Sequence, residues 1–145
     1  MKVLGFNFNK ISVEKFSGLP KAEELKINTN INIIDITSVK SDLIKTKEEL
    51  IGVKFNYSID YEPNFAKLDF SGDILIELDA KLQKDILRDW KTKDIPEEFK
   101  IFVFNIVLLK VTVKSLELEE STNIPFHMPL PSIPTKGKEK KPKQE

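Results

Sequence analysis

The chain has 145 residues, 40% hydrophobic and 32% charged, which is the composition of one globular domain that can bury a core without disulfides. It has no cysteine, which excludes disulfides, thiolate nucleophiles and cysteine-ligated metals, and a reducing, cytoplasmic location is expected. The 23 basic and 23 acidic residues balance, but residues 136–145 hold five lysines against two glutamates, so the rest of the chain carries −3 and disfavours specific nucleic-acid binding.

The first half of the chain is predicted to form four long strands. In residues 6–13 and 27–36 apolar side chains alternate with polar ones, but the parity switches midway in each stretch, which predicts β-bulges. In residues 51–61 the alternation is strict. After a turn at residues 62–64, even positions from Leu68 to Leu78 carry the apolar face, so the two stretches predict an antiparallel hairpin. Gly72 within it predicts a bulge or a close packing neighbour.

The second half changes to helical spacing. Residues 82–90 follow Asp79, a candidate helix cap, and the run Asp94 to Glu98 has the proline and the acidic residues of a second helix start. We expect one long helix from there to about Glu120, although its many β-branched residues leave open a strand covered on both faces. The fold class predicted is therefore α+β, with a four-stranded antiparallel sheet packed on a long C-terminal helix.

Residues 99–109 are apolar nearly all the way round a helix, whereas a helix lying on one sheet needs a single apolar stripe. A second copy of the chain is the expected partner, and twofold symmetry is the commonest arrangement of such a pair. The predicted interface residues are Phe99, Phe102, Ile106 and Leu109. The apolar window is also too short to span a bilayer, so no membrane insertion is expected.

Residues 124–134 contain four prolines, which favour an extended backbone, and they are apolar enough to be expected along the protein or in a neighbour's groove. The residues that follow are rich in lysine and low in complexity. We therefore predict a domain at residues 1–134 and a disordered tail at residues 135–145.

No motif in the chain indicates catalysis. His127 is the only histidine, the five glycines are scattered singly, and Asp69 and Asp73 share a strand face typical of a solvated surface. The sequence thus predicts a protein that is not an enzyme, with no cofactor and no metal.

Apolar side chains beside polar amides suggest polypeptide binding instead. Asparagines are frequent on the second face of the predicted sheet, where they could bond an extended client or simply face solvent, and the solvated face is favoured. The candidate polypeptide-binding residues are Phe6, Phe8, Tyr57, Phe126 and Met128.

The order of these elements, with the apolar helix at residues 99–118 and the segment Ile124-Pro125-Phe126-His127-Met128-Pro129-Leu130-Pro131, resembles the bacterial export chaperone SecB and its archaeal SecB-like relatives. The resemblance runs from about Val3 to Ile133. It implies a homo-oligomer, a dimer or tetramer, with an interface formed by the long helix. It also implies binding of non-native polypeptides in apolar grooves. Two features depart from SecB: a proline- and lysine-rich ending replaces its C-terminal amphipathic helix, and a short helix at residues 79–90 precedes the long one.

Two functions follow as hypotheses. The first is a SecB-like chaperone or adaptor for unfolded or nascent polypeptides, with a possible part in export. The alternative is an interaction module for a single partner, such as an antitoxin- or ribosome-associated protein, without general chaperone activity. A third hypothesis, an enzyme or lipid-binding protein with a hidden pocket, ranks below both.

Overall fold

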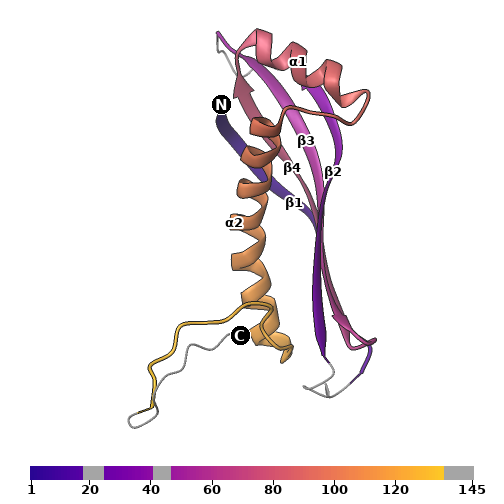
Figure 1. Ribbon diagram of the computed structural model, residues 1–145, viewed down its shortest axis with the longest axis vertical. Helices are drawn as coiled ribbons and strands as arrows, with labels where there is room; N and C mark the ends of the chain where they lie inside the picture. Colours follow the sequence, from indigo (N-terminus) through magenta and orange to yellow (C-terminus); the bar gives the residue numbers. More distant parts are fainter. Residues whose placement is uncertain (18–24, 41–46, 136–145) are drawn as a thin grey trace.

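The computed structural model describes residues 1–17, 25–40 and 47–135, and within them shows a four-stranded antiparallel sheet and two helices (Figure 1). The α+β class predicted from the sequence is confirmed. The predicted disordered tail lies, apart from Thr135, outside the described residues. The strands and helices are, in chain order, β1 (Lys2–Lys15), β2 (Lys26–Val39), β3 (Glu49–Glu62), β4 (Ala66–Leu78), α1 (Ala80–Trp90) and α2 (Glu97–Thr122).

The sheet order is β1-β4-β3-β2, so among the described residues β1 and β2 form its two edges. β3 and β4 are the predicted hairpin, in which Tyr57 pairs with Phe70. The predicted bulges are confirmed as register shifts, in β1 between Phe8 and Lys10 and in β2 between Ile33 and Asp35. These shifts explain why the apolar parity changes midway along both edge strands.

The core fills the space between one sheet face and the helices. Alternate residues of β3 and β4 point into it, and Ile86 of α1 joins the same cluster. α2 contributes a buried stripe with a spacing of four residues, which turns by about 40° around the helix axis at each step because four residues exceed one helical turn. The stripe is Phe99, Val103, Val107, Val111, Ser115 and Glu119.

Local sequence sets the helix ends. The side chain of Asp79 accepts a hydrogen bond from the Leu82 amide at 2.8 Å, as predicted for the cap of α1. α2 begins at Glu97 with Pro96 as its N-cap and no side-chain cap hydrogen bond. Asn123 ends α2 in the left-handed conformation. No helix among the described residues is both long enough and apolar enough to cross a bilayer.

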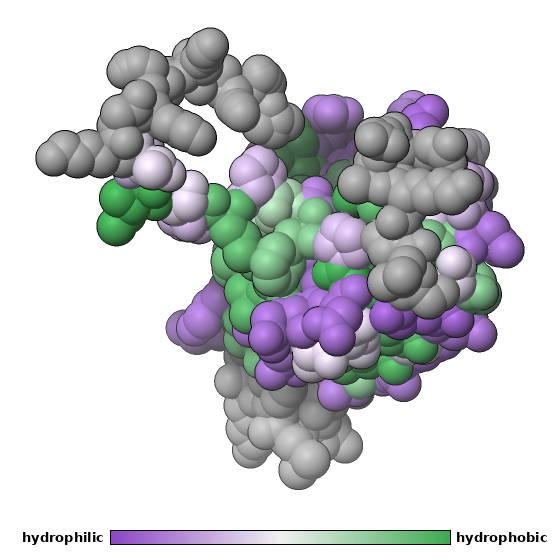
Figure 2. Space-filling view, turned by 90° about the horizontal axis from the view of Figure 1, so that it is seen from below, coloured by the Kyte–Doolittle hydropathy of each residue, from purple (hydrophilic) through white to green (hydrophobic). Residues whose placement is uncertain are grey.

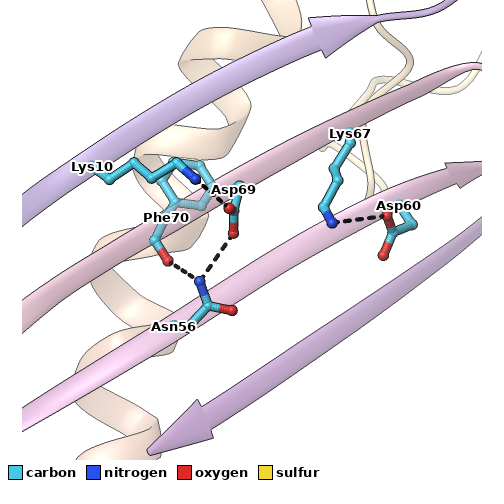
Figure 3. Close-up of polar contacts among 6 residues, drawn as sticks. All are labelled: Lys10, Asn56, Asp60, Lys67, Asp69 and Phe70. Carbon is cyan, nitrogen blue, oxygen red and sulfur yellow. Dashed lines mark hydrogen bonds and ion pairs between the residues drawn. The ribbon is translucent and has the colours of Figure 1, made fainter. Parts of the chain in front are cut away.

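The outer sheet face is polar. Lys10 and Asn56 both bond the carboxylate of Asp69, at 2.9 Å and 3.0 Å, and Lys67 lies 3.9 Å from Asp60 (Figure 3). The amides of Asn7, Asn9 and Asn28 likewise bond neighbouring side chains of the sheet. These amides already have hydrogen-bond partners within the sheet. This favours the interpretation of the face as a solvated surface over one that bonds an extended client.

Replacement of Asp69 by asparagine should remove a pH-dependent part of the stability. Partial burial alone would raise the pKa of the Asp69 carboxyl, but hydrogen bonds from Lys10 and Asn56 and the lysine charges outweigh it and hold that pKa below its ordinary value. A carboxyl with a lowered folded-state pKa stabilises the protein above its unfolded-state pKa, and loses that effect as the pH falls through the folded-state value. We expect Asp69→Asn to cost about 1 kcal/mol at neutral pH. Urea unfolding at a series of pH values should show this difference shrink below about pH 4; a constant difference would contradict it.

Candidate functional site

The predicted polypeptide-binding residues fall on three parts of the fold: β1, β3 and the segment after α2. Tyr57 is buried in the core on β3, where its ring lies 6.5 Å from that of Phe70, so it has no surface to offer a client. Phe6 and Phe8 are half-buried on β1 and their rings pack against Phe55. The structure therefore places these three in the layer between sheet and α2. The other two, Phe126 and Met128, are exposed on the segment after α2.

The predicted interface residues on α2 also divide. Phe99 is fully buried among the core residues of its own chain, so it is unavailable to a second copy and that prediction is corrected. Phe102 and Ile106 are partly buried against the core, and Leu109 is 67% exposed. The sequence shows apolar residues on several faces of this helix, and the buried stripe covers only one of these faces. The exposed apolar residues of α2 are Ile101, Leu108, Leu109 and Val113.

A groove of about 620 Å³ lies between the edge strand β2 and the start of α2. One wall is β2 at its bulge, where Ile34 is 55% exposed. The other is formed by Trp90 at the end of α1, by the α1–α2 connection and by the first two turns of α2. The lining residues are Ile31, Asn32, Ile33, Ile34, Trp90, Lys93, Asp94, Ile95, Glu97, Lys100 and Phe104.

Local hydrogen bonds position Trp90 in this groove. The indole nitrogen donates to Asp35 at 3.3 Å, and the same carboxylate oxygen accepts from the Ile36 amide at 2.9 Å. After α1 ends, Lys93 adopts a left-handed conformation and its amide bonds the Trp90 carbonyl at 3.0 Å. Its ammonium group lies 3.7 Å from the centre of the indole ring. The end of α1 and the connection that follows it thus form part of one wall of the groove.

The groove combines apolar surface with a free strand edge. Among the described residues, β2 pairs only with β3, so its outer edge leaves backbone N–H and C=O groups available. Two lysines and two acidic residues, Lys93, Lys100, Asp94 and Glu97, line it and balance in charge. Chemically this arrangement suits an extended peptide, which bonds an edge strand through its backbone and places alternate side chains on apolar surface.

A second polar cluster fixes the chain after α2. Glu119 is fully buried, the Tyr61 hydroxyl donates to its carboxylate, and His127 Nδ1 lies 2.8 Å from Glu119 Oε2. Burial, followed by the neighbouring Glu119, raises the pKa of the Tyr61 hydroxyl above its ordinary value, so it remains a proton donor. We call Tyr61, Glu119 and His127 the anchor cluster, because it holds His127 of the proline-rich segment against the end of α2.

The predicted binding residues included none of the groove residues. The groove joins residues 31–34 to residues 90–104, which no local pattern connects. Glu119 was not singled out from the sequence either, because it stands among other acidic residues. Counting from Phe99 in steps of four residues does place it on the buried stripe of α2. Among the described residues no group of three or more His, Cys, Asp or Glu side chains could hold a metal ion.

Comparisons with known proteins establish the fold. No family model matches the sequence, and no curated protein matches it. A solved structure that does match is the Mycobacterium tuberculosis Rv1957 SecB-like chaperone, in complex with a ChAD peptide from the Rv1956 HigA1 antitoxin. The match covers 92% of both chains, with a TM-score of 0.53 and 10% sequence identity. The resemblance to SecB is confirmed at the level of the fold: this chain has the fold of the SecB-like chaperones.

Proposed function

We propose that this chain is a polypeptide-binding chaperone or adaptor that holds extended segments of other proteins in the β2 groove. The observation that supports this most directly is the free edge of β2 beside a groove lined by Trp90, Ile95 and Phe104. Apolar burial would supply most of the affinity, at about 25 cal/mol per Å², and backbone hydrogen bonds along β2 would add to it. The peptide in the solved SecB-like complex supports the same class of ligand.

Substitution of Ile34 by aspartate tests the groove. Ile34 is exposed and lines the groove, so Ile34→Asp should leave the fold intact while placing a charge where an apolar side chain would dock. We expect the affinity for a synthetic extended peptide, with Ile or Phe alternating with Thr and Lys, to fall about tenfold in calorimetric titration.

The matched control is Ile11→Asp, because Ile11 is also an exposed isoleucine on an edge strand but lies outside the groove. It should bind the peptide like the unmodified chain. Equal losses in both variants would mean that the groove is not the binding site, and no binding by the unmodified chain would reject the proposed function.

A single dedicated partner is the second candidate, favoured by the antitoxin peptide bound to the SecB-like neighbour. The two candidates differ in breadth. A general chaperone would suppress the aggregation of several unrelated unfolded proteins, whereas an adaptor would bind one partner tightly and leave those proteins to aggregate.

The same proposal includes self-association, a cytoplasmic location and the lack of enzymatic activity. The exposed apolar residues of α2 would be covered in a homodimer or tetramer, as C2 symmetry would allow.

A part in protein export would need a hand-over partner, and co-purification with the membrane translocation machinery would test it.

A further inference from the structure

The chain after α2 forms an apolar arm that projects from the body. It leaves the end of α2 and extends outward in Figure 1, and Figure 2 shows apolar surface on it and where it joins the body. Phe126, Met128 and Leu130 are exposed, and Ile133 is 94% exposed. We name residues 128–134 the arm. Its exposed apolar side chains would be costly in water unless another surface covers them.

The arm and the β2 groove match in chemistry. The arm holds Pro129, Pro131 and Pro134, which favour an extended polyproline-like backbone with a low ordering cost. Proline-rich segments dock in grooves lined by aromatic side chains, and Trp90 and Phe104 line this one.

Geometry keeps the arm from filling the groove of its own chain. The anchor cluster fixes His127 beside Glu119, near the C-terminal end of α2. Along α2, Glu119 lies about 23 Å beyond Phe104 and about 33 Å beyond Glu97, at 1.5 Å per residue. The seven residues of the arm span only about 22 Å in a polyproline conformation. The arm could therefore meet only the near end of its own groove and could not fill it.

We propose that the arm of one copy occupies the β2 groove of a second copy, and so competes with clients. In a twofold pair whose α2 helices run antiparallel, the C-terminal end of one helix lies beside the N-terminal end of the other, where the groove begins. This inference rests on the proposed function, because it assigns the groove as a peptide site. As a consequence, each copy of the pair would block the groove of the other until a client displaces the arm.

Cross-linking between two full-length variants tests this directly. The chain has no cysteine, so Ile133→Cys marks only the arm and Asn32→Cys only the groove. Mixed together and treated with a short bismaleimide, they should give a cross-linked dimer that neither variant forms alone. The control replaces Asn32→Cys by Ile11→Cys on the opposite sheet edge and should give no dimer. A cross-link only within a chain carrying both Ile133→Cys and Asn32→Cys, or no cross-link, would overturn the proposal.

Peptide binding separates failure of this inference from failure of the proposed function. The full-length double variant Leu130→Asp/Ile133→Asp makes the arm polar at exposed positions, so it should bind the alternating peptide about tenfold more tightly than the unmodified chain. Unchanged affinity would reject the arm as a competitor and leave the groove as a client site. Absence of peptide binding by both chains would instead reject the proposed function.

Discussion

Replacement of Gly72 by alanine is expected to lower the free energy of unfolding by about 3 kcal/mol. Gly72 lies on β4 opposite the bulge of β1, and a Cβ atom there would collide with the backbone carbonyl of Asn7 and lie 2.9 Å from the Phe55 ring. The strand backbone cannot move aside as a flexible side chain could, so β1 would have to shift out of register. Urea denaturation monitored by circular dichroism measures the loss.

Gly5→Ala is the matched control. Gly5 lies on β1 of the same sheet, and a Cβ there would meet the Leu75 Cβ at 3.9 Å, an ordinary contact. Its stability should therefore change by less than about 0.5 kcal/mol. Equal stability of the two alanine variants would contradict the close approach of β1 to Gly72.

Removal of the Glu119 carboxylate is expected to cost about 3 kcal/mol and to release the segment after α2. In Glu119→Ala the buried hydroxyl of Tyr61 and the imidazole of His127 lose their shared partner, and a cavity replaces the side chain. Without this bond, the packing of Ile124 and its backbone bond to residue 119 still hold the start of the segment. Urea unfolding measures the stability, and limited proteolysis after Asn123 measures the release.

Two further variants interpret this result. Glu120→Ala removes an adjacent but exposed carboxylate and should change neither stability nor proteolysis. Glu119→Gln keeps an acceptor for Tyr61 and should lie between the alanine variant and the unmodified chain. A Glu119→Ala protein as stable and as resistant as Glu120→Ala would show that the anchor cluster does not hold the segment.

The sequence was most informative where one residue pattern has one structural cause. Strict alternation in residues 51–61 and the apolar even positions in residues 68–78 identified β3 and β4, because one face of the hairpin is buried and the other is solvated. The parity switches in the edge strands identified bulges. The proline and two glutamates before Phe99 correctly favoured a helix over a strand, since they suit only a helix start.

The candidate site was harder to predict, because it depends on packing between distant segments. Tyr57 was proposed as a client-binding residue, but strict alternation puts its ring on the buried face. Phe99 was proposed for an interface, although it begins the buried stripe of α2. The groove exists because α1 and the α1–α2 connection lie beside the bulge of β2, and nothing local in residues 31–34 or 90–104 indicates that they meet.

The position of Trp90 has a practical consequence. It is the only tryptophan in the chain, and it lies in the groove with the Lys93 ammonium group over its ring. Because indole emission depends on nearby charge and water, a ligand that displaced Lys93 or excluded solvent would change the intrinsic fluorescence of the protein. The occupancy of the groove can thus be followed by optical spectroscopy on the unlabelled chain, with no signal from any other tryptophan.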